Sequence, residues 1–327
     1  MISGLSGMIE RRTYMTEILK KLCRAPAVSG FGDAMRCTIE SELSCTGAKF
    51  DTDPLGDLIV TLPGDGKGER VMFLCPADEP GYYITSAEPA RAYFAPISGA
   101  DPKNDLKSDL HRADGSVFRF SGNEDGSAEY IDGSGLSPGD TLSVCSGHEE
   151  HDGMISGVNV KNRVVAATMC RAILRLSEAK RNRDLVFAFC FSEEKMHRGA
   201  RCASEMAGAR TLIAIAPAPI AGSDSRISAG NITLLIKDKT TMYTSELTDK
   251  IEKELKTAGI STVPEIRSDD ITFSSSLPLV SCAERIASLR IPFNADNGIQ
   301  RLSLSDSKML EDAIVKIAGS DIFENTT

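Results

Sequence analysis

The sequence predicts an α/β fold, in which helices flank a mixed, partly parallel sheet and a small all-β domain is inserted. Apolar segments short enough for buried strands alternate with segments whose apolar residues recur every three or four positions, the pattern of amphipathic helices. Between residues 82 and 153 this alternation stops, and short β-type segments such as SVFRF and DTLSV are separated by clusters of Gly, Asp, Ser and Pro. The predicted domains are therefore an α/β domain at residues 1–81 and 154–327, and an inserted all-β domain at 82–153.

The chain before the insert predicts two helices and then two strands. Residues 13–24 and 34–45 carry apolar side chains at helical spacing, and residues 57–62 and 70–75 are apolar strands. The segment Pro63-Gly-Asp-Gly-Lys-Gly68 between the strands predicts a hairpin loop. It lacks the spacing of a phosphate-binding loop, which needs four residues between two glycines and then Lys with Ser or Thr.

Helices and strands alternate again after the insert. The predicted helices are residues 162–178, 198–207, 245–258 and 307–318, and the predicted strands are residues 184–191, 211–216 and 227–236. Alternation of this kind places helices over both faces of a sheet whose strands are at least partly parallel.

Composition and charge exclude several classes of function. The formal net charge is −9 and no long run of Lys and Arg is present, which argues against a nucleic-acid partner. No apolar stretch approaches the roughly 18–20 residues of a membrane span, and Glu10, Arg11 and Arg12 stand where a signal peptide would be apolar. The nine cysteines include no Cys-x-x-Cys pair. Together these features predict a cytoplasmic protein with reduced, mostly buried thiols.

Three polar clusters lie where a sheet of this kind binds ligands, beyond the ends of strands. Glu193-Glu194 follows the apolar strand LVFAFCF, Asp78-Glu79 follows VMFLC, and Lys161-Asn-Arg163 opens a helix. Two adjacent carboxylates could supply a general base and a metal ligand. Each cluster also has an ordinary interpretation, as a solvated loop, a Pro/Gly turn and a basic helix cap respectively.

In combination, these segments resemble the tetrahedral, or deblocking and glutamyl, zinc aminopeptidases, a family sometimes labelled endoglucanase. The resemblance covers nearly the whole chain in the same order. It implies a zinc-exopeptidase-like α/β domain with an inserted small β-barrel, and an oligomeric assembly. The matching segments are Pro26-Ala-Val-Ser-Gly-Phe31, Asp53-Pro-Leu-Gly56-Asp-Leu-Ile where the family has Asp-x-x-Gly-Asn, the strand from Val71 to Gly81, Gly135-Leu-Ser-Pro-Gly139-Asp140, Lys161-Asn-Arg163 and Glu193-Glu194-x-x-x-Arg198-Gly-Ala200.

The resemblance also implies which residues would stand at the metal site. Members of the family hold two metal ions with a His, a bridging Asp, a Glu, a second Asp and a second His. In this chain Pro76 stands at the first His and Lys161 at the bridging Asp, while Glu194 keeps the Glu. The second Asp falls in Pro217-Ala-Pro219, and the second His falls in Phe293–Gly298, where no His occurs.

The residues around the ligands are better retained. Glu193 matches the general base, and Asp78 matches the acid that orients the ligands. Asp296 lies near the second missing His, so Glu194 and Asp296 are the two remaining candidates for a metal ligand. A two-zinc site needs several neutral or anionic ligands for each ion. The sequence therefore predicts a degenerate site without a metal.

Asp78, Glu193 and Glu194 would repel one another in the absence of a metal ion. Lys161 has the opposite charge to the bridging acid that it replaces. We therefore expect Lys161, helped by Arg163, to replace the metal structurally in a partly buried ion-pair cluster.

The lost ligands favour a non-catalytic, pseudoenzyme relative that forms homo-oligomers and binds a peptide or an active paralogous subunit. The alternative is an active aminopeptidase on short peptides, with a remodelled zinc or cobalt site and Glu193 as the base. A third hypothesis, a hydrolase with a nucleophile from Ser274-Ser-Ser276 or Cys75, lacks both a Gly-x-Ser-x-Gly element and a well-placed His.

Overall fold

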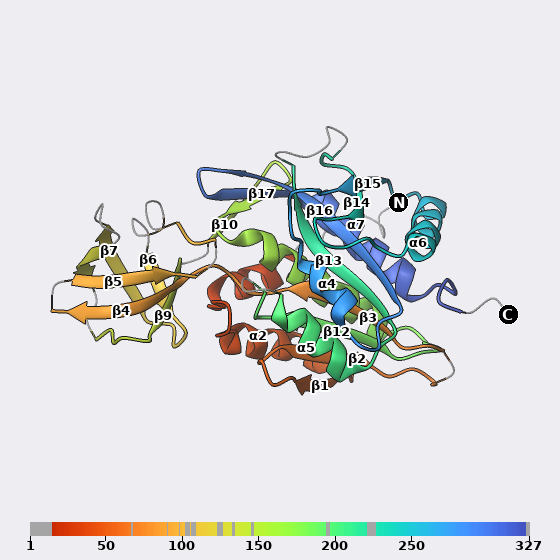
Figure 1. Ribbon diagram of the computed structural model, residues 1–327, viewed down its shortest axis with the longest axis horizontal. Helices are drawn as coiled ribbons and strands as arrows, with labels where there is room; N and C mark the ends of the chain where they lie inside the picture. Colours follow the sequence, from red (N-terminus) through yellow and green to blue (C-terminus); the bar gives the residue numbers. More distant parts are fainter. Residues whose placement is uncertain are drawn as a thin grey trace, which may run out of the picture.

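The computed structural model describes residues 15–324, except for residues 67, 90, 98, 102–104, 106–108, 123–126, 133–134, 145–146, 194–196 and 221–226. These residues form a large α/β part and, at one end of it, a separate small barrel (Figure 1). The predicted α/β fold class is confirmed. No helix in the described part of the chain combines the length and the apolar character needed to cross a membrane.

The described part of the α/β region contains an eleven-stranded mixed sheet. Its main path runs in the order β1-β2-β12-β3-β13-β16-β17-β11-β10, and β14 and β15 branch from β16. The four neighbours β12, β3, β13 and β16 are mutually parallel. The strands are β1 Lys49–Thr52, β2 Leu58–Leu62, β3 Val71–Pro76, β10 His148–His151, β11 Met154–Gly157, β12 Leu185–Cys190, β13 Thr211–Pro219, β14 Ile232–Lys237, β15 Thr262–Ile266, β16 Arg285–Asp296 and β17 Ile299–Ser303.

Helices cover both faces of the sheet, because alternate side chains of each strand point to opposite faces. Phe73 and Phe187 stack at 5.5 Å on one face, while Met72 and Val186 belong to the apolar cluster on the other. The first face packs against a helix at residues 15–24 and against α2, α4, α6 and α7; the second packs against α5 and η2. The helices are α2 Asp33–Leu43, η1 Ser44–Thr46, α4 Val160–Ser177, α5 Arg198–Ala207, α6 Ser245–Thr257, η2 Phe273–Leu279 and α7 Leu304–Ala318.

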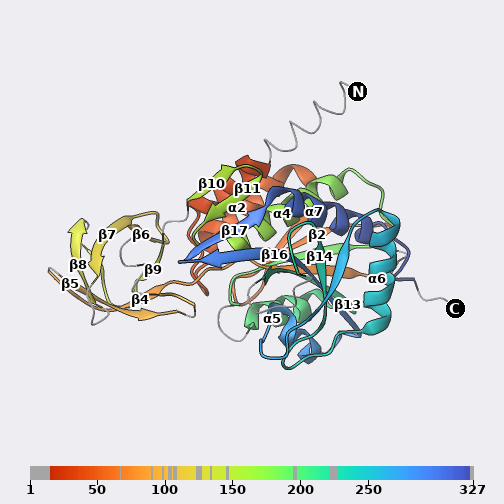
Figure 2. The same ribbon diagram turned by 90° about the horizontal axis from the view of Figure 1, so that it is seen from above.

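The small barrel is closed by six antiparallel strands in the order β4-β5-β8-β7-β6-β9. It has its own apolar core, with Tyr82, Phe94 and Phe120 in edge-to-face contact. Figure 2 shows it set apart from the helices and the main sheet. Its strands are β4 Tyr82–Glu88, β5 Arg91–Pro96, β6 Asp109–Arg112, β7 Val117–Gly122, β8 Ser127–Asp132 and β9 Thr141–Val144.

The structure differs from the sequence prediction at the end of the insert. Residues 82–153 were expected to belong to the all-β domain. Instead, His148 and His151 are the first and last residues of strand β10. This strand pairs with β11, and β11 pairs with β17 of the main sheet. Strands of the main sheet and strands of the barrel have the same local sequence pattern. The periodicity of the sequence therefore did not show that β10 belongs to the main sheet.

The predicted hairpin of β2 and β3 is wrong, because β12 lies between these two strands. The Gly-rich loop that joins β2 to β3 passes over the chain just before β12. Asp65 and Gly68 donate backbone hydrogen bonds to the carbonyl oxygens of Arg181 and Asn182, at 3.1 and 2.7 Å. The glycines therefore permit a close approach between two segments far apart in the sequence.

Candidate functional site

A pocket with a volume of about 370 Å³ lies beyond the carboxyl ends of the parallel strands. Ligands of α/β proteins bind at this edge of a sheet. The loops after β3 and β12, the ends of β13 and β16, the start of α4 and the segment before η2 all contribute to its walls. The lining residues are Pro76, Asp78, Lys161, Asn162, Glu193, His197, Ala216, Pro217, Pro219, Asp270, Ile271, Thr272, Phe273, Arg290 and Phe293.

The two acids that the sequence placed at the site, Asp78 and Glu193, come together in this pocket. Both are almost fully buried, and Asp78 Oδ2 accepts a hydrogen bond from the backbone N–H of Glu193 at 2.7 Å. Glu193 Oε1 accepts one from the N–H of Ala200 in the first turn of α5 at 2.5 Å, and Glu193 Oε2 lies 3.4 Å from His197 Nδ1. Backbone donors therefore stabilise both carboxylates without a metal ion.

A third acid, Asp57, lies behind this pair and is completely buried. Its Oδ1 accepts a hydrogen bond from the N–H of Phe191 at 2.6 Å, whereas Oδ2 has no hydrogen-bond partner among the described residues. Gly199 lies directly against Asp57 and Glu193, because a Cβ on Gly199 would be 2.4 Å from Asp57 Oδ2 and 2.7 Å from Glu193 Oε1. Burial raises the pKa of Asp57 to about 8; the Phe191 hydrogen bond opposes this, and the charges of Asp53 and Glu193 add to it.

Lys161 lines the same pocket from the start of α4. Its backbone N–H donates to the side chain of Gln300 at 2.8 Å, and its ammonium nitrogen lies 5.6 Å from the centre of the Phe293 ring. Among the described residues, the Lys161 ammonium forms no ion pair or hydrogen bond. Glu194, the third acid of the expected ion-pair cluster, lies outside the described residues, so the expectation that Lys161 replaces the metal structurally stays a prediction.

Arg163 does not take part in the pocket either. Its guanidinium pairs with Glu79 at 2.5 Å, and both side chains are 1% exposed. It also donates to the carbonyl oxygens of Leu22, Ala25 and Asn159. Burial acts to raise the pKa of Glu79, but the charge and hydrogen bond of Arg163 outweigh it and hold that pKa below its usual value. Arg163 thus fixes α4 to the first helix and the loop after β3.

The wall formed by the end of β13 carries no carboxylate at the position of the second metal-binding Asp. Pro217 and Pro219 line the pocket there, and their carbonyl oxygens accept hydrogen bonds from Arg290 and Arg267 respectively. Both arginines also pair with the fully buried Glu265. A buried cluster of two arginines and one glutamate therefore supports this wall.

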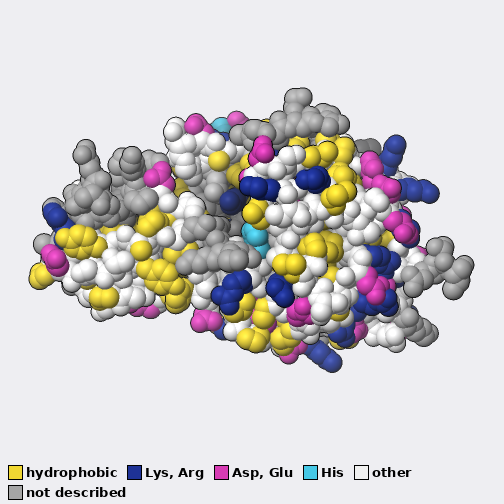
Figure 3. Space-filling model, viewed as in Figure 1, with side chains coloured by type: hydrophobic (Ala, Val, Ile, Leu, Met, Phe, Trp, Pro, Cys, Tyr) yellow, Lys and Arg dark blue, Asp and Glu magenta, His cyan; other side chains and the backbone are white. Residues whose placement is uncertain are grey.

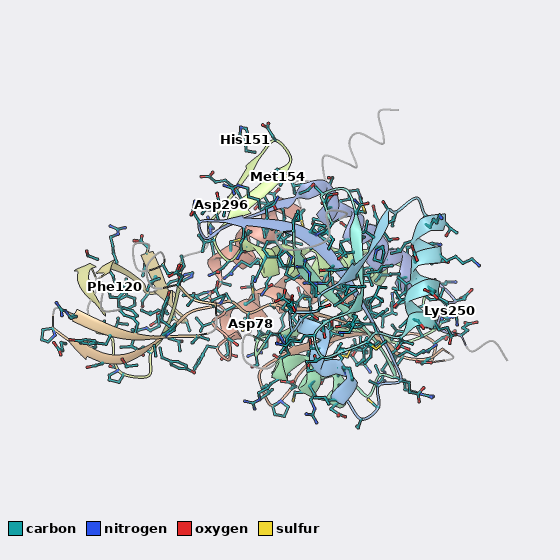
Figure 4. The ribbon with its side chains drawn as sticks, turned by 45° about the horizontal axis from the view of Figure 1, so that its top comes forward. Asp78, Phe120, His151, Met154, Lys250 and Asp296 are labelled. Atoms are coloured by element: carbon teal, nitrogen blue, oxygen red, sulfur yellow. The ribbon has the colours of Figure 1, made fainter. Side chains whose placement is uncertain are left out.

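The two residues predicted as the remaining metal ligands are not placed together. Glu194 lies outside the described residues. Asp296 is exposed at the end of β16, in the β16–β17 hairpin, and does not line the pocket. Figure 4 shows Asp296 away from Asp78. Phe293, three residues earlier on the same strand, faces the pocket instead.

The alternative nucleophiles have structural roles. Ser274 and Ser275 belong to the hydrogen-bonded cluster at the start of η2, where they contact Tyr243 and the buried Asp238 at 2.7 and 2.5 Å. Ser276 donates to the carbonyl oxygen of His197 at 3.0 Å. Cys75 is fully buried, and burial raises the pKa of its thiol well above the usual value.

Several described residues that line this pocket are unsuited to binding a metal ion. Pro76 and Pro217 offer no side-chain ligand atom, and Lys161 brings a positive charge. In the part of the chain that the structure describes, no group of three or more His, Cys, Asp or Glu side chains is arranged to hold a metal ion.

Sequence reasoning missed part of the site. Arg290 lies on β16, which was not among the predicted strands, so its place in the pocket follows only from the sheet order; the segment from Phe293 was placed at the site by the resemblance. Asp57 had a visible signal, because it stands where the resemblance expects Asn in the segment after Gly56. The replacement of an amide by an ionisable group at the start of a buried strand is the signal that could have identified Asp57 as a residue of the site.

A family model and several solved structures of aminopeptidases are similar to this chain. The family model described as M42 glutamyl aminopeptidase matches residues 125–295, just over half of the chain. A search of curated protein sequences finds no significant match.

Solved structures resemble this chain over nearly its full length. An aminopeptidase from the archaeon Desulfurococcus kamchatkensis has a TM-score of 0.86 at 16% identity, with 97% of this chain and 99% of that chain covered. A TET aminopeptidase from a marine sediment thaumarchaeon has a TM-score of 0.84 at 15% identity, with 94% and 96% covered. The TET1 peptidase of Pyrococcus horikoshii has a TM-score of 0.81 at 19% identity, with 95% and 100% covered. At these identities the likeness concerns the fold.

Proposed function

Because this chain belongs to the M42 glutamyl aminopeptidase family, we propose that it is a member without peptidase chemistry, whose pocket binds a peptide or a similar small ligand instead of cleaving it. A metallopeptidase needs an electrophilic metal ion that polarises the substrate carbonyl and lowers the pKa of a bound water molecule. The proposal is that this chain retains the family's fold and pocket but lacks that centre.

The observation that carries the proposal is the ammonium group of Lys161 in the pocket wall. By resemblance, this position belongs to the acid that bridges two metal ions. Replacing a carboxylate by an ammonium changes an attraction for two dications into a repulsion, and the interaction is strong because the site is partly buried. Pro76 and Pro217 on neighbouring strands add no ligand atom that could compensate.

The assembly of this chain is part of the same proposal. The TET1 peptidase of Pyrococcus horikoshii is described as assembling into a tetrahedron or a large octahedral shell. Met242 and Ile266 are 79% and 59% exposed, and Figure 3 shows apolar side chains gathered over β14 and β15. We propose that the chain forms a cytoplasmic homo-oligomer, or joins an active paralogous subunit, through such apolar surface.

One observation favours the alternative function, an active aminopeptidase with a remodelled zinc or cobalt site. Glu193, the residue that matches the general base, lines the pocket and is only 4% exposed. Buried carboxylates in pockets are common among catalytic bases. One oxygen of this carboxylate already accepts a hydrogen bond from the N–H of Ala200.

Metal content tests the proposal directly. The chain is purified without chelator, dialysed against zinc or cobalt, and measured by elemental mass spectrometry, with hydrolysis of aminoacyl p-nitroanilides assayed in the same samples. We expect far less than one ion per chain and no chelator-sensitive hydrolysis. One tightly held ion per chain, with hydrolysis that chelator and Glu193→Gln both abolish, would establish the alternative.

A double variant supplies the matched control. Pro76→His with Lys161→Asp returns two of the family's ligand types to the pocket, beside the retained Asp78. We expect this variant to take up more zinc than the unmodified chain under the same dialysis, because both changes supply ligand atoms. Equal uptake by the two proteins would show that these positions do not control metal binding.

A further inference from the structure

The Lys161 ammonium is a positive charge in the pocket without a described acidic partner. The side chain is half-buried, and its ammonium nitrogen lies 5.6 Å from the centre of the Phe293 ring. A ring face attracts a cation only weakly compared with a carboxylate. The positive charge is therefore available to a ligand.

Three acids also line the pocket, Asp78, Glu193 and Asp270. Asp78 accepts from the N–H of Glu193, and Glu193 accepts from the N–H of Ala200 and lies beside His197. Arg290 adds a guanidinium to the same wall, where it is held by Glu265 and by the carbonyl oxygen of Pro217. The wall formed by α4 and β16 thus presents positive charge, and the wall formed by the loops after β3 and β12 presents carboxylates.

The pocket also has apolar surface, beside the polar residues Asn162, Asp270 and Thr272. Pro76 and Pro217 close the pocket from the strand ends, and Phe273 and Phe293 present aromatic rings. The volume of about 370 Å³ is at the lower end of the range found for small-molecule pockets, about 300–1,000 Å³. A ligand that fits must be small, partly apolar and anionic at the end that meets Lys161.

We propose that this pocket binds a small carboxylate, the free α-carboxylate of an amino acid or dipeptide, which pairs with Lys161 while its apolar side chain packs against Phe293 and the prolines. This inference rests on the non-catalytic function proposed above and names the ligand class of that function. The ligand's ammonium group then lies toward the carboxylates of Asp78 and Glu193, which line the same pocket. A pocket that holds cations in the family thus holds an anionic group here.

Isothermal titration calorimetry with matched probes tests the inference. The probes are the dipeptide alanyl-phenylalanine, its C-terminal amide and free phenylalanine. We expect the free dipeptide to bind at least about tenfold more tightly than its amide, because amidation removes the charge that pairs with Lys161. Free phenylalanine distinguishes the two sources of the carboxylate, because equal or tighter binding of the amino acid would assign the pocket to amino acids.

Two variants localise the effect. Lys161→Met retains the length and the packing of the side chain on Phe293, so the variant should fold normally; we expect it to weaken binding of the free dipeptide about tenfold and to leave binding of the amide unchanged. Lys250→Met removes a lysine from α6, which Figure 4 shows away from Asp78, and should leave both affinities unchanged.

Equal affinity for the free dipeptide and its amide would overturn the inference, as would an unchanged affinity of Lys161→Met. So would the absence of saturable binding of all three probes up to about 10 mM. Chelator-sensitive hydrolysis of the dipeptide, followed by amino-acid analysis of the same samples, would instead overturn the proposed function. The two failures are therefore distinguishable.

Discussion

Asp57 is an acid in a position that favours its neutral form. The side chain is completely buried, one oxygen lacks a hydrogen-bond partner among the described residues, and the carboxylates of Asp53 and Glu193 are close. Burial without a cation penalises the charged form, which explains why the pKa rises to about 8. A neutral carboxylic acid is close in shape to the Asn that the resemblance expects at this position, so we expect Asp57 to occupy that site as a protonated acid.

Asp57→Asn should raise the free energy of unfolding at pH 7. Between the pKa of the unfolded chain, 3.8, and that of the folded chain, about 8, the unfolded state releases a proton that the folded state retains. The stability of the unmodified chain therefore falls as the pH rises through this interval, and then levels off. The variant has no such loss and should be more stable at pH 7 by on the order of 2–4 kcal/mol.

Urea unfolding at several pH values between 4 and 9 measures this difference. Asp51→Asn, at an exposed acid on β1, removes the same formal charge without touching the buried site and serves as the control. If the Asp57→Asn variant and the unmodified chain lose stability in parallel over the whole interval, Asp57 is ionised in the folded protein and the explanation fails.

At the scale of secondary-structure elements, the loop between β2 and β3 depends on a close backbone approach. Gly64 lies against residue 183 just before β12, and a Cβ at this position would be 2.2 Å from the carbonyl oxygen of Arg183. The N–H of Gly64 also donates to Asp184 at 3.0 Å. The Arg183 carbonyl is part of the backbone, and Asp184 is held by its hydrogen bond to Gly64. Neither group can therefore move aside without a cost in free energy.

Gly64→Ala should therefore destabilise the chain by about 1–3 kcal/mol, the usual cost of forcing extra atoms into a packed region. The midpoint of urea unfolding measures the change. Gly147→Ala is the matched control: a Cβ there would meet nothing within 4 Å, so its effect should stay within about 0.5 kcal/mol. Equal effects of the two substitutions would show that the contact with residue 183 does not constrain the loop.

At the scale of the whole molecule, the exposed apolar surface at β14 and β15 predicts association of copies of this chain. A single chain has a mass of 35.1 kDa. Light scattering coupled to size-exclusion chromatography should give a multiple of that mass, because apolar side chains as exposed as Met242 and Ile266 are more stable when covered. Met242→Glu with Ile266→Glu should shift the elution towards smaller species, since each change places a charge in the contact.

A matched surface change controls for general effects of added charge. Val117→Glu substitutes an exposed apolar residue, 55% exposed on β7 of the barrel, and should leave the mass unchanged. A mass of one chain for the unmodified protein would contradict the proposed homo-oligomer. An unchanged mass of the double variant would place the interface elsewhere.

Local sequence pattern was sufficient for much of this fold. The amphipathic spacing in residues 34–45 and the apolar run at 184–191 predicted α2 and β12 to within a few residues, because each element buries one face or both faces over its whole length. The order of motifs along the chain also identified the family, and the fold class follows from it. The resemblance implies that Pro76 and Lys161 stand where the family has metal ligands, and this stays a prediction about function.

The tertiary structure determined which strands and residues are neighbours. No local pattern places β12 between β2 and β3, or brings Arg290 and Phe293 of β16 to the pocket of Lys161, because these neighbours meet only through the order of strands in the sheet. The tertiary structure also determined which charged residues form ion pairs. Arg163 was expected beside Asp78 but pairs with Glu79, since the direction of the α4 side chains relative to the loop after β3 determines which acid it reaches. The sequence therefore determines which residue types are present, whereas packing determines their partners, burial and ionisation.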